Sequence, residues 1–182
     1  QERAVLLFGE AYGRRTVALR LFNVSGPGQA LSNPYTGVLA NFAARIANGE
    51  PPLVFEDGNQ RRDMVHVRDV ARAFRLALEA PKAAGLTFNI GSGTSISIAE
   101  LARTLIASMG ADLQPEILQR ARSGDIRHCF ADITQAREGL GFVPRRRLAE
   151  ELPEIVDWVC STEAIDNAME MRRHLEARGL VS

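Results

Sequence analysis

The stretch Glu56–Ala71, EDGNQRRDMVHVRDVA, decides how the rest of the chain is interpreted. It begins with the turn dipeptide Asp57-Gly58, and the charged run Arg61–Asp63 follows soon after. The apolar segment Met64–Val67 predicts a short β-strand. Asp69 then predicts the N-cap of an amphipathic helix, because its side chain can accept hydrogen bonds from free N–H groups in the first turn. A turn, a charged corner, a strand and a helix start therefore lie within sixteen residues.

The charged corner is suited to bind an anion, because rigid elements hold it on both sides. We interpret Asp63 as a structural residue that steadies the arginines beside it. His66 lies inside the predicted strand, and we interpret it as a core residue with its hydrogen bonds satisfied. The other histidines, His128 and His174, share no ligand spacing with it, so we expect no metal site.

Composition indicates a globular protein without a bias towards nucleic acid or membranes. The chain has 182 residues, of which 46% are apolar and 24% charged, which is sufficient for a packed core. Its 22 basic and 22 acidic side chains cancel, so net charge predicts neither a nucleic-acid nor a membrane partner. No apolar run is long enough to span a membrane. The widely separated Cys129 and Cys160 form no disulfide framework, and we expect a cytoplasmic location.

The segment before the opening stretch predicts a helix followed by a strand. Residues 1–13 predict the helix, which a glycine ends. Thr16–Val24 is apolar and β-branched with little alternation, which predicts a buried strand of a parallel sheet. Asn23 lies at the exit of this strand, before the turn Ser25–Gly28. Open α/β sheets bind their ligands at such strand exits.

Downstream, helices and short strands do not alternate one-to-one as they do in a complete doubly wound domain. The expected strands are Leu53–Phe55 and Thr87–Ile90. The expected helices cover residues 38–46, 70–80, 98–109, 133–140, 148–159 and 163–178. One of them opens with the capping box Ser97-x-x-Glu100, and Asp132 can cap another.

Polar residues in the turns predict a diphosphate site. Arg62 and Arg122 each lie in a polar turn flanked by acidic residues, and guanidinium groups can bind phosphate through two parallel hydrogen bonds. Asn23 offers a neutral donor and acceptor, and Asp125 can accept hydrogen bonds from ribose hydroxyls. A solvated surface charge is the alternative for each arginine alone. Spacing along the chain does not by itself bring Arg62 and Arg122 together.

Four motifs occur in order along the chain. They are L-R-x-F-N-V-S-G-P at 19–27, D-G-x-x-x-R-D-x-V-H-V-x-D-V-A at 57–71, F-N-I-G-S-G at 88–93 and R-x-G-D at 122–125. Together they resemble the C-terminal half of the NAD-dependent epimerase/dehydratase family, the extended short-chain dehydrogenase/reductases that act on nucleotide sugars. The resemblance runs from Gln1 to about Val159. Residues 33–38 and 124–130 are most similar to the sugar 4-epimerase branch, such as UDP-glucose 4-epimerase or dTDP-rhamnose 4-epimerase-like members.

The resemblance implies a nucleotide-sugar site. Asn23 matches the asparagine that contacts the substrate. Arg62 matches the arginine that binds the diphosphate, which leaves Arg61 as an exposed neighbour. Arg122 and Asp125 match the pair that binds the diphosphate and the nucleoside. Four apolar residues match segments that border the nucleotide or pack on its base, namely Val38, Leu39, Leu53 and Phe55.

The implied fold is α/β. It consists of a small substrate-binding lobe plus the last strands and helix of an NAD(P)-binding Rossmann-fold domain whose N-terminal part is missing. Residues 1–30 are expected to be the remnant of the Rossmann domain, and residues 31–182 mainly the substrate-binding domain. Residues 65–93 are expected to return to the Rossmann sheet.

The chain departs from the family in the residues that carry the chemistry. Family members use a Tyr-x-x-x-Lys dyad and a glycine-rich fingerprint that binds the dinucleotide. Neither Tyr12 nor Tyr35 has a lysine four positions later, since Lys82 is the single lysine. Gly26–Gly28 lacks the third glycine of the fingerprint. We expect no catalytic residue in this chain, with the dyad and most of the NAD contacts upstream of Gln1 and the fragment itself inactive.

The expected function is the nucleotide-sugar-binding part of an NAD-dependent 4-epimerase, which oxidises the sugar at C4 and returns hydride to the opposite face. A 4,6-dehydratase or decarboxylase of the same family is one alternative. A non-catalytic nucleotide-sugar-binding or scaffold protein is the alternative of another class. The expected partners are a UDP- or dTDP-sugar and a second copy of the chain. The apolar stripe of the first helix, Val5, Phe8 and Tyr12, resembles the family's dimer helix, and a stripe packed in the core is the alternative.

Overall fold

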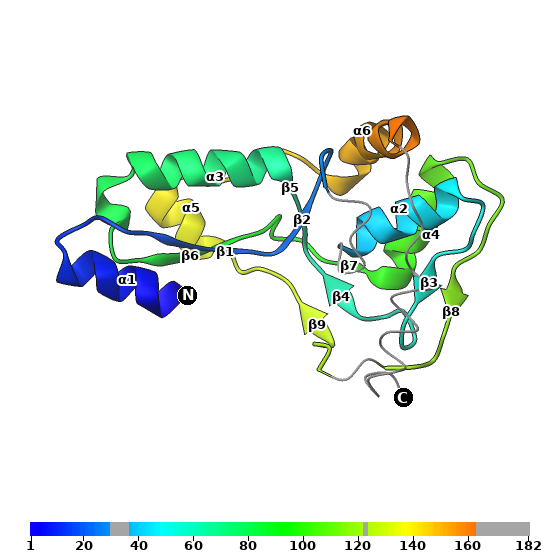
Figure 1. Ribbon diagram of the computed structural model, residues 1–182, viewed down its shortest axis with the longest axis horizontal. Helices are drawn as coiled ribbons and strands as arrows, with labels where there is room; N and C mark the ends of the chain where they lie inside the picture. Colours follow the sequence, from blue (N-terminus) through cyan, green and yellow to red (C-terminus); the bar gives the residue numbers. More distant parts are fainter. Residues whose placement is uncertain (30–36, 122–123, 163–182) are drawn as a thin grey trace.

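The protein has two lobes joined by a pair of parallel strands, as a computed structural model of residues 1–29, 37–121 and 124–162 shows (Figure 1). The helices are α1 (Glu2–Ala11), α2 (Val38–Ala47), α3 (Val67–Glu79), the 3-10 helix η1 (Pro81–Ala83), α4 (Ile98–Ser108), α5 (Thr134–Leu140) and α6 (Leu148–Ser161). The strands are β1 (Ala18–Leu21), β2 (Asn23–Ser25), β3 (Leu53–Val54), β4 (Arg61–Arg62), β5 (Met64–His66), β6 (Thr87–Ile90), β7 (Ile96–Ser97), β8 (Glu116–Ile117) and β9 (His128–Cys129). Helices packed on parallel strands confirm the expected α/β class.

The first lobe is built on the parallel pair β1–β6, in register from Ala18 opposite Thr87 to Leu21 opposite Ile90. Helices α3 and α5 lie on one side of this pair, and α1 lies on the other (Figure 1). The core between them consists of Val65, Val70, Ala73, Ala77, Ala83, Phe88, Ile90, Ala136, Leu140 and Phe142. Because α5 follows β6 by more than forty residues, this core closes only when distant parts of the chain meet.

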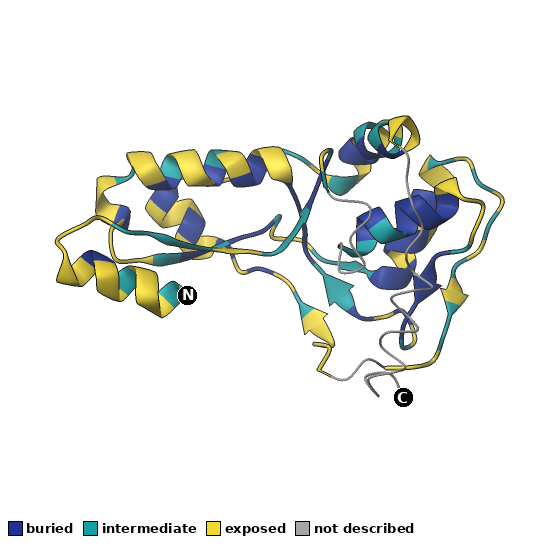
Figure 2. Cartoon of the chain, viewed as in Figure 1, coloured by how far each residue is buried: buried dark blue, intermediate teal, exposed yellow. Residues whose placement is uncertain are grey.

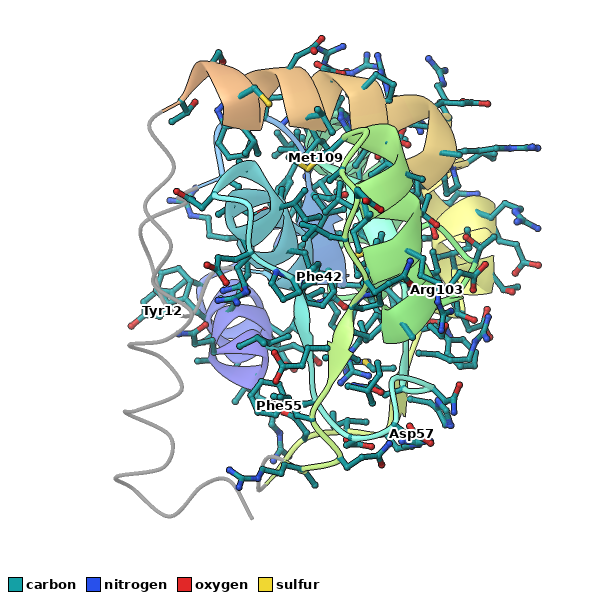
Figure 3. All side chains as sticks on the ribbon, turned by 90° about the vertical axis from the view of Figure 1, so that its right-hand side faces the viewer. Tyr12, Phe42, Phe55, Asp57, Arg103 and Met109 are labelled. Carbon is teal, nitrogen blue, oxygen red and sulfur yellow. The ribbon has the colours of Figure 1, made fainter. Side chains whose placement is uncertain are left out.

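The second lobe is a bundle of α2, α4 and α6 with short strands along its edge (Figure 1). Strands β3 and β8 form a parallel pair, and β4 lies between β7 and β9 in a small mixed sheet. The buried residues concentrate on α2 and α4 (Figure 2). Phe42 is 2% exposed and lies at the centre of this lobe (Figure 3). Each lobe therefore has its own hydrophobic core.

The strand predicted over Thr16–Val24 is divided in two at Phe22. The N–H of Phe22 donates to the carbonyl of Ile90 at 3.0 Å, whereas the N–H of Asn23 donates to the carbonyl of Asp63 at 3.2 Å. The chain therefore exchanges β6 for β5 as its partner at this point. The prediction that the whole strand is buried was wrong for the end of β1, because within the described residues only β6 pairs with it.

Helix α3 begins earlier than predicted, with His66 rather than Asp69 as its N-cap. The Nδ1 atom of His66 accepts a hydrogen bond from the N–H of Arg68 at 3.2 Å. Asp69 is 3% exposed and accepts hydrogen bonds from the N–H groups of Arg145 and Arg146 at 2.9 and 3.1 Å. The prediction for Asp69 was wrong because the loop before α6 folds back onto it, which no local pattern can show.

The start of α4 follows the prediction, whereas the N-cap of α5 is Ile133 and not the predicted Asp132. The Ser97 hydroxyl accepts a hydrogen bond from the N–H of Glu100 at 3.2 Å at the start of α4. The Asp132 carboxylate accepts one from the N–H of Thr134 at 2.9 Å at the start of α5. The helix predicted over residues 163–178 lies outside the described residues.

The apolar stripe of α1 is on the surface. Val5, Phe8 and Tyr12 are 45%, 56% and 69% exposed, and the rings of Phe8 and Tyr12 lie 4.5 Å apart. The stripe is therefore not part of a core within the described chain. No helix in the described ranges is both long and apolar enough to cross a membrane.

Candidate functional site

A small hollow lies where β2 leaves the junction between the lobes. Asn23 lines it from the strand, Val38 and Leu39 line it from the first turn of α2, and Met64 contributes from β5. The volume of the hollow is about 170 Å³. Three of the predicted substrate residues therefore meet in one place, although they come from segments fifteen residues apart.

Arg62 is linked to this hollow through the backbone. It precedes Asp63, whose carbonyl accepts the hydrogen bond from Asn23. Its Nη1 atom donates to the carbonyls of Arg61 and Arg127 at 2.9 and 3.2 Å. Within the described part of the chain, Nε and Nη2 of Arg62 donate to no acceptor. The guanidinium is thus held on one side and keeps N–H groups free for an anion.

The loop predicted to bind the diphosphate and the nucleoside is anchored beside Arg62. Arg122 itself lies outside the described residues, and Asp125 is exposed. The loop continues into β9, in which Cys129 pairs with Arg62 in parallel register. The structure therefore attaches this loop to β4, a proximity that spacing alone did not predict.

The two residues predicted to contact the base are largely covered. Leu53 and Phe55 are each 8% exposed, and neither lines the hollow beside Asn23. The carbonyl of Phe55 accepts a hydrogen bond from Gln60 at 2.8 Å. Figure 3 shows Phe55 close to the turn that carries Asp57. In this conformation they present little apolar surface to a base.

The prediction that Arg61 is an exposed neighbour was wrong. Its Nε atom donates to the hydroxyl of Ser95 at 2.8 Å, and its Nη2 atom donates to the carbonyl of Ser95 at 2.7 Å. Both bonds follow from the antiparallel pairing of β4 with β7, which places Arg61 opposite Ser97. Arg61 is therefore used to join two strands.

The prediction that Asp63 steadies the arginines was also wrong. Asp63 is fully buried and accepts hydrogen bonds from the N–H groups of Ser92, Gly93 and Ala131 at 2.6, 3.0 and 3.2 Å. Successive residues of an extended chain point to opposite sides, so its carboxylate faces away from Arg62. It joins the turn after β6 to the segment before α5.

His66 is buried as predicted, with 1% of its surface exposed, but only one of its ring nitrogens is satisfied. Its Nε2 atom has no hydrogen-bond partner among the described residues and lies 3.9 Å from a carboxylate oxygen of Glu154. Burial lowers the pKa of His66, and the positive charge of Arg146 lowers it further. The neutral ring is therefore favoured.

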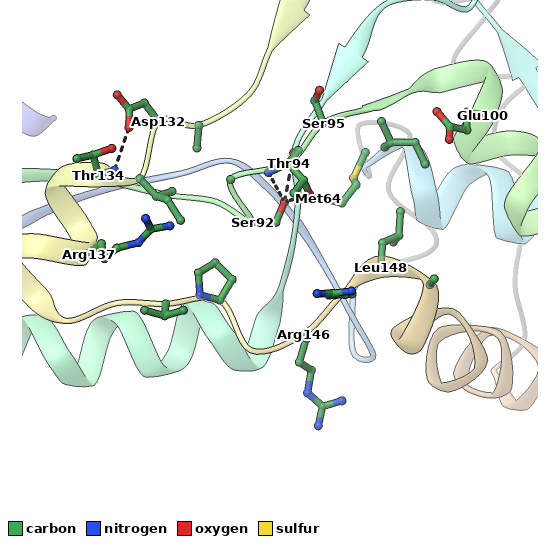
Figure 4. A pocket seen from close by; sticks show the side chains of 18 of the residues that line it. Met64, Ser92, Thr94, Ser95, Glu100, Asp132, Thr134, Arg137, Arg146 and Leu148 are labelled. Carbon is green, nitrogen blue, oxygen red and sulfur yellow. Dashed lines mark hydrogen bonds between the residues drawn. The ribbon is translucent and has the colours of Figure 1, made fainter.

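A larger hollow of about 850 Å³ lies between the lobes and was not predicted (Figure 4). Arg137 faces it from α5, whereas Arg146 turns away and pairs with Glu154 at 3.4 Å. Several polar groups of its wall are already engaged, since Ser95 binds Arg61 and the N–H of Ser92 binds Asp63. The guanidinium of Arg62, with its free N–H groups, and the hollow beside Asn23 are therefore the better candidates for binding an anionic ligand.

Arg127 is a residue of this region to which the sequence analysis assigned no role. Its side chain binds the Glu56–Asp57 turn, and its carbonyl accepts the bond from Arg62. The available signal was its position two residues after Asp125, within the segment that resembles sugar 4-epimerases.

The glycine turns at Gly26–Gly28 and Gly91–Gly93 do not fit a dinucleotide pyrophosphate. Such a site uses free N–H groups at a glycine turn that opens directly into a helix. In the Gly91–Gly93 turn, Asp63 already occupies the N–H groups of Ser92 and Gly93. The Gly26–Gly28 turn follows β2, but α2 begins only at Val38. These two turns therefore do not supply the free N–H groups that a dinucleotide pyrophosphate needs.

Comparison with known proteins decides the family. Residues 1–91 match the model of the NAD dependent epimerase/dehydratase family. The chain belongs to this family. It is 38% identical over 141 residues to dTDP-L-rhamnose 4-epimerase from Burkholderia thailandensis, which covers 78% of the chain and 39% of that protein. It is 32% identical over 155 residues to dTDP-glucose 4,6-dehydratase from Streptomyces niveus, which covers 84% of the chain and 44% of that protein.

Solved structures of epimerases share the fold of this family member. The structure of UDP-glucose 4-epimerase from Thermotoga maritima with UDP-glucose aligns with a TM-score of 0.80 and 36% identity, covering 86% of the chain and 50% of that structure. The resemblance inferred from the motifs is therefore confirmed. The chain spans half or less of the length of each of these three proteins.

Proposed function

We propose that this chain is the nucleotide-sugar-binding part of an NAD-dependent nucleotide-sugar 4-epimerase and is inactive by itself. The observation that carries the proposal is the convergence of Asn23, Arg62 and the loop of Asp125 on one strand junction. A neutral amide, a guanidinium with free N–H groups and a carboxylate suit a sugar, a diphosphate and a ribose, respectively.

Each predicted residue has a role in this proposal. Arg62 and Arg122 bind the diphosphate, and Asp125 accepts hydrogen bonds from the nucleoside. Asn23 contacts the sugar portion. The apolar contacts to the nucleotide and its base come from Val38, Leu39, Leu53 and Phe55. Binding of this kind, remote from the reacting carbon, holds the sugar in position for chemistry carried by other residues.

The wider organisation is part of the same proposal. Residues 1–30 and 65–93 are assigned to the NAD-binding Rossmann domain, and the remainder of 31–182 mainly to the substrate-binding domain. The Tyr-x-x-x-Lys dyad and the main NAD contacts would come from residues outside this chain. The substrate is a UDP- or dTDP-sugar, the assembly is a homodimer through α1, and the location is cytoplasmic.

A 4,6-dehydratase is the second candidate, because the identity to the Streptomyces niveus dehydratase is close to that of the epimerase relatives. A decarboxylase of the same family would use the same nucleotide contacts. A non-catalytic nucleotide-sugar-binding or scaffold protein is the candidate of another class. The coding sequence before Gln1 separates these classes: a glycine-rich βαβ segment there supports an enzyme, and an initiator methionine directly before Gln1 supports the scaffold.

Replacement of Arg62 tests the nucleotide site. We expect the wild-type chain to bind UDP or dTDP in isothermal titration calorimetry. Arg62→Ala should weaken binding by roughly 2 kcal/mol, about thirtyfold, because a charge-assisted hydrogen bond to the phosphate is lost. Arg75→Ala is the matched control, since Arg75 is an exposed arginine on α3 that pairs with Glu79. Equal affinities of the Arg62 and Arg75 variants would refute the assignment.

A further inference from the structure

The side chain of Arg127 is clamped to the turn that follows β3. Its Nη1 and Nη2 atoms donate to the two carboxylate oxygens of Asp57 at 2.7 and 2.8 Å, and Nη1 also binds the carboxylate of Glu56. This is the two-pronged geometry in which a guanidinium holds a carboxylate most specifically. Two negative charges therefore compensate one positive charge, and Arg127 itself is not free to bind a phosphate.

The backbone on both sides of this clamp adopts an unusual conformation. Glu56 and Gln119 have φ angles of +52° and +53°, a region that residues other than glycine rarely enter. They are joined directly, because the N–H of Gln119 donates to the carbonyl of Glu56 at 3.1 Å. The N–H of Glu56 in turn donates to the carbonyl of Arg120 at 2.9 Å. The loop that carries Asp125 is thus tied to the Glu56–Asp57 turn at its start and, through Arg127, at its end.

The main chain of Arg127 holds the side chain of Arg62, the residue that we expect to bind the diphosphate. Its carbonyl accepts hydrogen bonds from Nη1 of Arg62 at 3.2 Å and from the N–H of Arg61 at 3.3 Å. The remaining bond of Nη1 goes to the carbonyl of Arg61, the residue directly before Arg62. The position of the Arg62 guanidinium therefore depends on where the backbone of Arg127 lies.

Asp57 and Arg127 stabilise each other in their charged forms. The hydrogen bonds from Arg127 hold the pKa of Asp57 well below its usual value, and the N–H of Asn59 lowers it further. The same contacts raise the pKa of Arg127. Both partners remain charged across the pH range in which enzymes work.

We infer that Arg127 is a positioning residue that orients Arg62 towards the diphosphate by holding the backbone of β9 against the Glu56–Asp57 turn. The inference rests on the proposed nucleotide-binding function and adds to it a residue that does not touch the ligand. It assigns a different role to each of Arg61, Arg62 and Arg127. Arg62 binds the diphosphate, Arg61 joins two strands, and Arg127 holds Arg62 in position.

The first test needs no nucleotide. The Nε–Hε group of Arg62 can be followed by ¹⁵N relaxation in the 182-residue chain. In Arg127→Met we expect its order parameter to fall, while the spectrum elsewhere remains that of a folded protein. Arg20→Met is the matched control, because Arg20 also forms a two-pronged pair, with Glu2 at 2.7 Å, on the other lobe. An unchanged order parameter of Arg62 in Arg127→Met would overturn the inference even if UDP does not bind.

The second test is a double-mutant cycle on UDP affinity. We expect Arg127→Met and Asp57→Asn each to weaken UDP binding about tenfold, and Arg127→Met to have no further effect in an Arg62→Ala background. Additive losses for Arg62 and Arg127, or a loss for Arg127→Met without one for Asp57→Asn, would show that Arg127 contacts the phosphate itself and would reject the positioning role. Absence of UDP and dTDP binding by the wild-type chain would count against the proposed function and leave the relaxation experiment to decide the role of Arg127.

Discussion

At the scale of single residues, the side chain of Asp63 joins two segments that are distant from it in the sequence. Its carboxylate is fully buried and receives three backbone N–H groups, from the turn after β6 and from Ala131. Gly91 lies against it so closely that an added Cβ would stand 2.6 Å from a carboxylate oxygen. The packing of this corner therefore depends on one acidic residue with glycine beside it.

Asp63→Ala should lower the free energy of unfolding by about 3 kcal/mol, because it removes the buried carboxylate that accepts three backbone hydrogen bonds. Urea denaturation followed by the fluorescence of the single tryptophan, Trp158, measures this change. Asp112→Ala is the control, since Asp112 is exposed, and it should change stability by less than about 0.5 kcal/mol. A loss below 1 kcal/mol for Asp63→Ala would contradict the role assigned to its carboxylate.

At the scale of elements, the negative charge of an acidic side chain in α3 acts on a buried acidic side chain in α6. Glu151 of α6 is 2% exposed and faces the negative charge of Asp69 in α3. Burial and, after it, the charge of Asp69 raise the pKa of Glu151 to about 7, although Arg146 opposes the shift. At neutral pH and above, the folded state therefore contains a buried negative charge at Glu151 that is energetically unfavourable.

The pH dependence of stability follows from this shift. The folded state binds the Glu151 proton more tightly than the unfolded state does. Its contribution to the free energy of unfolding is therefore complete below the ordinary pKa of 4.5 and is lost as the pH rises to about 7. Glu151→Gln should remove this dependence and make the protein about 2 kcal/mol more stable than wild type at pH 8. Thermal unfolding at pH 5 and pH 8 provides the comparison.

The neighbouring Glu150 is the control for this prediction. It lies in the same helical turn but is exposed, so Glu150→Gln should leave the pH profile of the wild type unchanged. Equal stabilisation by both substitutions at pH 8 would indicate a general effect of negative charge and not burial of Glu151.

At the scale of the whole molecule, the two lobes differ in how much apolar surface they leave exposed. The first lobe exposes Val5, Leu7, Phe8, Tyr12, Leu21, Phe74, Leu78 and Leu86. Exposed apolar patches, such as the stripe of Val5, Phe8 and Tyr12 on α1, are characteristic of interfaces between proteins. This distribution supports the proposed homodimer through α1.

Phe8→Ser should weaken self-association of the chain roughly tenfold, because a large aromatic side chain is removed from the centre of the proposed contact. Sedimentation velocity over a range of concentrations measures the effect. Phe130→Ser is the matched control, since Phe130 is 55% exposed and Phe8 is 56% exposed, but Phe130 lies beside β9. A monomeric wild-type chain, or an equal effect of both substitutions, would contradict the proposed dimer contact.

Local patterns predicted the elements and several of their ends. Helix α2 was expected over 38–46 and covers Val38–Ala47, and the cap at Ser97 forms as expected. These features depend on residues within one helical turn of one another, which is the range over which sequence patterns report directly. The family resemblance depended on four short motifs, each of which is local in the sequence. The comparison with known proteins confirmed it.

The errors have a common physical cause. The interpretations of Arg61 as an exposed neighbour, of Asp63 as a support for the arginines and of Asp69 as an N-cap considered only residues that are close in the sequence. Each of these side chains instead binds a segment at least 29 residues away, namely Ser95, Ser92 and Arg145. A buried polar group takes whichever partner the fold brings to it, because leaving it unpaired is costly.

The sequence by itself determined the α/β class, the positions of the main helices and the family to which the chain belongs. Only the tertiary structure decided that β1 and β2 exchange partners at Phe22, that Asn23 shares a hollow with Val38 and Leu39, and that Arg127 supports Arg62. The stretch Glu56–Ala71 shows this division most directly. Its turn and strand follow from local residue preferences, whereas the direction of each charged side chain depends on strands and loops that pair with it from elsewhere in the chain.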